Sequence, residues 1–365
     1  MITMYLDLWG LVGGLVHWLM VDIVGTILDW LHLYALADWL GSPGVLQIIT
    51  ILVVALIILI VGMLVSITLI WQERKMLGRF MDRVGTQVGP FGLFQNFADA
   101  FKVLVKEYIV PNAADRLIYP LAPILIIGVS MAMFVTIPYS QGFYMSDSDL
   151  SVILTLAMFG VIPFAVLLGG WASNNKYTLI GGMRAAAQTC AYEVPLLLSV
   201  ASVVVLTGSL SLNDVVAYQQ ENVWMVVPLI IGFLVFIISM ISEIERVPFD
   251  LPEAEAELVE GWGTEYGGMR FGLIMMSEYA RAFVGSSLVA LLFLGGWAGP
   301  TFGIIPEGLW FLLKMFLVFT IFIWARAALP RVRTDQILHI CWKRLLPLAA
   351  INLFIAVFFK TMGWF

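Results

Sequence analysis

Acidic side chains gather between Ser242 and Arg270, a stretch that lies between two apolar runs long enough to cross a bilayer. Its acids are Glu243, Glu245, Asp250, Glu253, Glu255, Glu257, Glu260 and Glu265, opposed only by Arg246 and Arg270. So many carboxyls in an apolar chain need open water, cations on a partner, or raised pKa values that leave some of them protonated at neutral pH. Such groups suit proton transfer or the binding of a partner.

Local spacing suggests how these acids are presented. If Pro252 opens a short helix, as proline can at a first turn, Glu253, Glu257 and Glu260 share one face. Like charges at that spacing destabilise an isolated helix by about 0.2–0.5 kcal/mol per pair. The simpler alternative is a solvated acidic loop. Large apolar residues interleave with the acids: Phe249, Leu251, Leu258, Trp262 and Tyr266. A purely solvated loop would not need them.

Composition places the chain among polytopic membrane proteins, because 61% of its 365 residues are hydrophobic and only 12% are charged. Cys190 and Cys341 lie far apart, and no histidine stands at ligand spacing. The sequence therefore indicates neither a disulfide framework nor a metal or iron–sulfur site. It also lacks a glycine-rich nucleotide loop. If the chain takes part in redox chemistry, we expect the cofactors on other subunits.

The hydropathy pattern predicts an all-α fold with about eight transmembrane helices and large amphipathic cytoplasmic loops. The expected spans are 45–72, 117–138, 150–171, 190–208, 224–244, 271–297, 308–328 and 345–361. The predicted membrane domain is therefore 45–365, with cytoplasmic loops at about 73–116, 172–189, 246–270 and 329–344.

Basic residues sort between the two sets of loops. One set carries Arg74, Lys75, Arg79, Arg83, Lys102, Lys106, Arg116, Lys176, Arg184, Arg246, Arg270, Arg331, Arg333, Lys343 and Arg344. The other set, near 139–149, 209–223 and 298–307, has none, and only Lys360 departs from the pattern. The positive-inside rule then predicts a multi-pass protein in which the first set of loops is cytoplasmic and both termini lie outside.

The first 44 residues contain no Lys or Arg. Asp22, Thr26 and Asp29 recur at helical spacing among Trp18, Leu19, Ile23, Ile27, Leu28 and Leu31. This pattern predicts an N-terminal extension, 1–44, that forms an amphipathic helix along the membrane surface. The alternative is a ninth span, which would place Asp22 and Asp29 at a costly depth in the membrane.

The first cytoplasmic loop predicts a second amphipathic helix. After glycines and Pro90 break the chain, apolar residues fall on one face while Asp99 and Lys102 lie elsewhere. The apolar positions are Phe94, Phe97, Phe101 and Leu104. Such a helix packs against protein or lipid headgroups.

Charges inside expected spans should be paired, cavity-facing or protonated because an isolated charge there is costly. Glu278 and Arg281 stand at i, i+3, which is compatible with a structural ion pair. Lys314 either reaches a headgroup or pairs with an acid on another helix. Glu193 and Glu243 are best explained by a polar path inside the bundle, continuous with the acidic stretch.

At these residues the chain resembles a family of membrane proteins, the H subunits of proton-pumping NADH-quinone oxidoreductase, respiratory complex I, whose mitochondrial counterpart is subunit 1. The resemblance is carried by GLFQNFADAFKVLVKE (92–107) and ERVPFDLPEAEAELVEGWGTEYGGMRFG (245–272). It extends from about residue 71 to the C-terminus. The run from Gly85 to Pro90 departs from the family pattern, lacking a proline and an arginine, and Glu245 is an added acid.

The resemblance implies a subunit that forms the quinone-access chamber beside the peripheral arm and helps couple quinone reduction to proton translocation. It implies no cofactor on this chain, a lipid quinone as substrate, and FMN and iron–sulfur clusters on partner subunits. The partners would be peripheral-arm, small membrane and antiporter-like subunits together with membrane lipids, and no nucleic acid. The candidate chamber or coupling residues are Asp99, Lys102, Arg184, Glu193, Glu243, Arg246, Asp250, Glu253, Glu255, Glu257, Glu265 and Glu278.

Two other functions remain open at this point. Relatives of complex I that take electrons from ferredoxin, another reduced carrier or hydrogen share such a membrane module. A stand-alone ion or solute transporter would use the buried carboxylates to bind its ion, but such folds often show two repeated halves. No internal repeat is visible in the sequence, and the large amphipathic loops favour docked partners.

Overall fold

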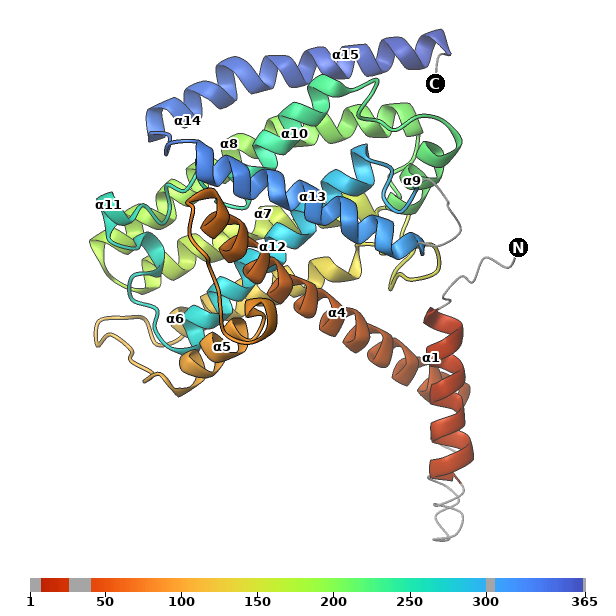
Figure 1. Cartoon of the computed structure of the whole chain (residues 1–365), viewed down its shortest axis with the longest axis horizontal. Coiled ribbons are helices and arrows are strands. Elements are labelled where there is room, and N and C mark those ends of the chain that lie inside the picture. Colours follow the sequence, from red (N-terminus) through yellow and green to blue (C-terminus); the bar gives the residue numbers. More distant parts are fainter. Residues whose placement is uncertain (1–7, 26–40, 300–305, 364–365) are drawn as a thin grey trace.

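Helices make up almost all of the regular structure in the computed structural model, which describes residues 8–25, 41–299 and 306–363 (Figure 1). Within those ranges the only bridge between extended segments is the isolated pair Ser140 and Phe143. The predicted all-α, multi-pass architecture is confirmed.

The N-terminal half contains α1 (Leu8–His17), the π-helix η1 (Trp18–Gly25), α4 (Pro43–Phe80), α5 (Gln95–Val105), α6 (Ile118–Ala132), α7 (Ser151–Ala172) and α8 (Lys176–Thr207). The C-terminal half contains α9 (Leu212–Glu221), α10 (Ile230–Glu243), α11 (Glu255–Leu258), α12 (Met269–Phe293), α13 (Glu307–Ala328), α14 (Thr334–Ile340), the π-helix η5 (Cys341–Leu345) and α15 (Leu346–Met362). Short 3₁₀ turns lie at Pro90–Gly92, Met133–Val135 and Gly261–Gly263.

Every expected span corresponds to a helix. Among the described residues, six helical segments are long and apolar enough to cross a membrane: α4, α6 with its 3₁₀ end, α7, α8, α13, and α14 through α15. Of the other two, α10 has only 14 residues, and α12 includes Glu278 and Arg281 within its apolar sequence.

The long helices run broadly side by side across Figure 1 and pack around α8 and α12. Helix α8 contacts α7, α10 and α15, while α12 contacts α4, α6 and α13. Asn175 starts α8 by accepting a hydrogen bond from the Tyr177 N–H at 3.1 Å. A Cβ at Gly181 would lie 2.6 Å from the Trp262 nitrogen, so only glycine lets α8 approach the acidic stretch this closely.

The acidic stretch contains less helix than the proline predicts. The helix does not begin at Pro252: α11 covers only Glu255–Leu258, and Val259 ends it with a φ of 67°. A Cβ at Gly261 would collide with the Pro252 carbonyl, so the chain doubles back there. The prediction that Glu253, Glu257 and Glu260 share a helical face is therefore wrong, because the fold places the first and last of them outside the helix.

The other predicted cytoplasmic loops, in contrast, contain more helix than expected. Helix α4 continues to Phe80, α8 begins at Lys176, and α14 occupies Thr334–Ile340. The expected amphipathic helix after Pro90 is α5. Of the N-terminal extension, the described part is α1 and η1, and the predicted positions Thr26, Ile27, Leu28, Asp29 and Leu31 lie outside the described residues.

Candidate functional site

A buried ion pair stands at the end of α10. Arg281 of α12 donates from Nη1 to Glu245 Oε2 at 3.1 Å, and the two side chains are only 2% and 4% exposed. Glu245 adopts a φ of 59°, a conformation that few non-glycine residues take, as the chain turns sharply out of α10. The guanidinium Nε and Nη2 have no hydrogen-bond partner. Each charge therefore depends on the other for compensation in this apolar setting.

Glu243, the last residue of α10, lies next to this pair and is buried. Its Oε2 has no hydrogen-bond partner. The charged groups that act on it are Glu193, Glu245 and Arg281. Glu193 itself lies against α7, because a Cβ at Gly160 would be 3.0 Å from its Oε1. Helices α7, α8, α10 and α12 thus meet around Glu193 and Glu243.

A second buried cluster joins α4, the acidic stretch and α13. Glu73 accepts from Arg246 at 3.0 Å and also pairs with Arg326. The Arg246 guanidinium lies over the Tyr279 ring, 4.5 Å from its centroid. Glu73 is absent from the candidates named from the sequence. Its position directly after the long charge-free run from Trp39 to Gln72 is the signal that could have identified it.

Asp250 and Glu253 lie in the acidic stretch, beyond the end of α10, and interact with charged groups of other elements. Asp250 pairs with Arg331 at 2.8 Å, yet burial raises its pKa above the usual range, and Arg331 only partly offsets that effect. Burial, followed by the nearby charge of Glu278, raises the pKa of Glu253 well above its usual value. The nearby Glu278 therefore favours the protonated form of Glu253.

The remaining predicted residues lie nearer the surface. Arg184 of α8 pairs with Glu257 at 2.6 Å, and Glu265 accepts from Asn175 Nδ2 at 2.7 Å. Asp99 pairs with Arg74, while Lys102 is exposed on α5. The Glu255 side chain lies outside the part of the chain that the structure describes. These contacts hold the acidic stretch and α5 against the bundle.

Arg281 and Lys314, two cations inside the expected spans, have partners other than those that the sequence suggests. Arg281 does not use Glu278 as its partner, because the turn after α10 brings Glu245 to it instead. Lys314 donates to the backbone carbonyls of Leu294, at 2.6 Å, and Ala298, just beyond the end of α12. That end of the helix carries partial negative charge, which compensates the ammonium.

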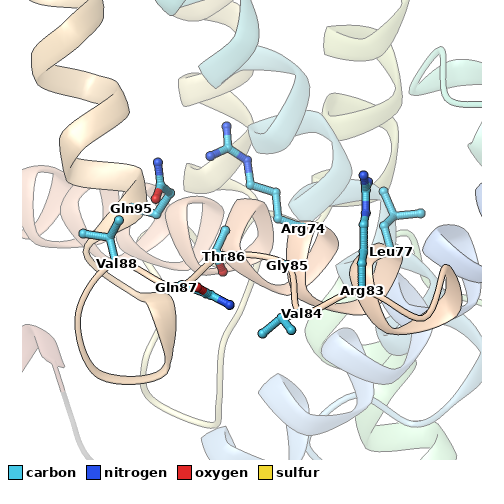
Figure 2. Close-up of a pocket in the computed structure, with 9 residues that line it drawn as sticks. All are labelled: Arg74, Leu77, Arg83, Val84, Gly85, Thr86, Gln87, Val88 and Gln95. Atoms are coloured by element: carbon cyan, nitrogen blue, oxygen red, sulfur yellow. The ribbon is translucent and has the colours of Figure 1, made fainter.

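An open pocket of about 720 Å³ lies between the end of α4 and the start of α5, and Figure 2 shows the residues that line it. Its lining combines cationic, amide and apolar side chains: Arg74, Leu77, Arg83, Val84, Gly85, Thr86, Gln87, Val88 and Gln95. The Thr86 carbonyl accepts from Lys75 Nζ at 2.8 Å and ties this segment to α4. The pocket can therefore receive a molecule with both polar and apolar parts.

Beside the pocket, α5 exposes a row of large apolar side chains: Phe94, Phe97, Phe101 and Leu104. The helix touches α4 and α12, and Asn96 fixes it by donating to the Ile67 carbonyl at 2.8 Å. This apolar row is available to lipid or to another chain. Elsewhere in the described residues, no group of three or more His, Cys, Asp or Glu side chains is arranged to hold a metal ion.

Comparison with known proteins identifies the family. The model of the NADH dehydrogenase family matches residues 52–357. The H subunit of NADH-quinone oxidoreductase from Dehalococcoides mccartyi (strain CBDB1) is 45% identical over 309 residues, 84% of this chain and 86% of that protein. Its counterpart from Bacillus thuringiensis (strain Al Hakam) is 46% identical over 296 residues, 80% and 89% of the two chains. This multi-pass membrane protein therefore belongs to the NADH dehydrogenase family, alongside the H subunits of NADH-quinone oxidoreductase.

Proposed function

We propose that this chain is the membrane subunit that forms the quinone-access chamber of an NADH-quinone oxidoreductase of the complex I type. In this role it also helps couple quinone reduction to proton translocation across the cell inner membrane. It acts without a redox cofactor of its own, and FMN and iron–sulfur clusters belong to the peripheral partners. The proposal rests on the family membership and on the geometry of the acids.

The observation that carries the coupling role is a linked series of carboxyls. Glu193 and Glu245 both act electrostatically on Glu243. Glu245 is in turn influenced by Glu278 and Asp250, the same groups that act on Glu253. A proton gained or lost at one member changes the proton affinity of the next. The series runs from the loop stretch into the bundle, which is the arrangement that coupling between a loop-side reaction and the membrane requires.

The chamber role is supported by the surfaces around the acids. The pocket between α4 and α5 offers arginine and amide groups to the oxygens of a quinone ring. The apolar row on α5 suits an isoprenoid tail or the surface of a neighbouring subunit. Asp99 and Arg74 hold α5 beside the pocket, and Arg184 with Glu257 holds the acidic stretch on α8. We assign these four residues a positioning role.

The proposal is tested by tagging the chain, extracting it in mild detergent and assaying NADH-driven reduction of a short-chain quinone. The co-purifying proteins are identified in the same preparation. We expect activity together with iron–sulfur and antiporter-like partners. Partners without NADH activity would assign the chain to a relative of complex I with another electron donor. A stable lone protein that transports an ion would overturn the proposal.

A further inference from the structure

The N-terminal helix lies outside the residues that the family model matches, which begin at 52. Helix α1 buries Leu8, Val12 and Val16, spaced four residues apart, and packs against α4. Two hydrogen bonds fix its start: the Leu8 N–H donates to the Gly142 carbonyl at 3.2 Å, and Trp9 Nε1 donates to the Tyr144 carbonyl at 3.1 Å. Helix α1 is therefore held at the bundle end that carries the 139–149 loop.

The direction of this helix distinguishes the two interpretations of the sequence. Figure 1 shows α1 running across the direction of α4, α13 and α15 rather than parallel to them. A ninth span would run with the other long helices. The place and direction of α1 fit a helix that lies in the plane of the membrane surface.

Away from α4, helix α1 exposes one row of large apolar side chains. Leu11, Leu15 and Trp18 are each more than half exposed, at 60%, 58% and 55%. The neighbouring side of the same helix exposes small or polar residues instead: Gly10, Gly14 and His17. Three large apolar side chains left in water would each lose the stabilisation that burial gives. The row that they form therefore calls for an apolar neighbour.

The apolar neighbour can be identified from α4. The part of α4 that holds α1, around Thr50, also exposes Ile48, Leu52 and Leu56. These residues belong to the most apolar of the candidate membrane spans among the described residues, and only 22% of its most apolar 18-residue window is buried, so they face lipid. The row on α1 adjoins this lipid-facing surface. Tryptophan, the third residue of the row, is enriched at the boundary between headgroups and hydrocarbon.

We propose that α1 and η1 form an in-plane membrane anchor, whose row of Leu11, Leu15 and Trp18 binds the lipid leaflet on the Gly142 side of the bundle. The anchor does not need anionic lipid, because residues 1–44 contain no Lys or Arg and apolar burial supplies the attraction. Through its two hydrogen bonds it ties the loop after α6 to that leaflet. The inference does not depend on the proposed quinone or proton chemistry.

The test places a nitroxide label at Leu15→Cys or, as the matched control, at Gly14→Cys, with Cys190→Ser to remove the other exposed thiol. The labelled protein, in its native complex, is reconstituted in nanodiscs of zwitterionic lipid. Accessibility of the label to oxygen and to a water-soluble nickel chelate is then measured. We expect the Leu15 label to be severalfold more accessible to oxygen than to nickel and the Gly14 label to show the reverse. The same contrast should persist when anionic lipid is added.

Other outcomes would overturn the anchor. Two labels that both report the bilayer core would indicate a ninth span, and two that are both shielded from oxygen and nickel would indicate a covering protein subunit. A contrast that forms only with anionic lipid would contradict a purely apolar anchor. If Leu15→Cys does not assemble, Trp18→Cys with His17→Cys as its control repeats the comparison. NADH-driven quinone reduction in the Leu15→Cys complex should match that of the unaltered one, which separates this test from that of the proposed function.

Discussion

The two ends of the helix bundle both carry acids, but they accommodate them differently. At the end with the acidic stretch, Glu73, Glu245 and Asp250 each pair with an arginine from another element. At the opposite end, Asp147 is exposed and accepts from Asn213 at 2.6 Å, while Asp214 accepts from Ser209 at 2.7 Å. Water already stabilises acids of the second kind. Acids of the first kind are buried at a cost, which is why they mark the candidate site.

The largest effect that this comparison predicts is at Arg281. Replacing it (Arg281→Met) leaves Glu245 buried without its cation, and breaking a buried pair in this way typically costs about 3–5 kcal/mol. We expect a sharp loss of assembled complex and a lower melting temperature. The double variant with Glu245→Gln should recover most of both, because no buried charge is then left unpaired.

The opposite end supplies the matched control. Asp147→Asn changes an exposed acid, so its effect should remain within about 0.5 kcal/mol. Yield and melting temperature of the purified complex are compared for the three variants. If Arg281→Met is as stable as Asp147→Asn, the contrast between the two ends does not exist.

A smaller, pH-dependent effect is expected at Glu253. Its folded-state pKa is raised, first by burial and then by Glu278. Glu253 therefore contributes fully to the free energy of unfolding at pH values below the usual carboxyl pKa, and this contribution is lost as pH rises through the folded-state pKa. In Glu253→Gln this loss is removed, so the melting temperature should fall less between pH 5 and pH 8 than it does in the unaltered protein.

The control for this profile is Glu221→Gln, whose side chain is exposed at the opposite end of the bundle. Its melting curve should follow that of the unaltered protein at each pH. A Glu253→Gln profile that also follows the unaltered protein would mean that Glu253 is not a buried, proton-binding carboxyl.

The smallest effect is expected where an ion pair of the acidic stretch reaches solvent. Arg184 pairs with Glu257, whose side chain is about half exposed. Pairs of this kind contribute about 0.2–1 kcal/mol, so Arg184→Ala should lower the melting temperature only slightly, with less effect at high salt. If Arg184→Ala lowers the melting temperature as much as Arg281→Met does, the exposed ion pair of the stretch contributes as much stability as the buried one.

Hydropathy and helical periodicity predicted the elements well. The helices at all expected spans, the amphipathic α5 and the depth of Glu243 follow from patterns within single segments, which a sequence displays directly. The partner of a buried ion does not follow from patterns within one segment. Local spacing favours Glu278 for Arg281, but the turn at Glu245, with its positive φ, presents a different carboxyl.

Two further features depended on contacts that do not follow helical spacing. The helix expected from Pro252 is shortened because Gly261 folds back onto the Pro252 carbonyl. Glu73 joins the site only because Arg246 and Arg326 approach it from elements more than 170 residues away. Neither contact has a periodic signature, so neither could be read from local pattern.

The central claim is that carboxyls inside the bundle, and not acids in general, link quinone reduction to proton movement. It is tested most directly by measuring NADH-driven quinone reduction and proton translocation in complexes carrying Glu243→Gln or Glu221→Gln. We predict that both complexes assemble, that Glu221→Gln keeps full activity, and that Glu243→Gln loses coupled activity by about 10²-fold, the low end for a positioned proton-transfer group. Full coupled activity in Glu243→Gln would contradict the claim.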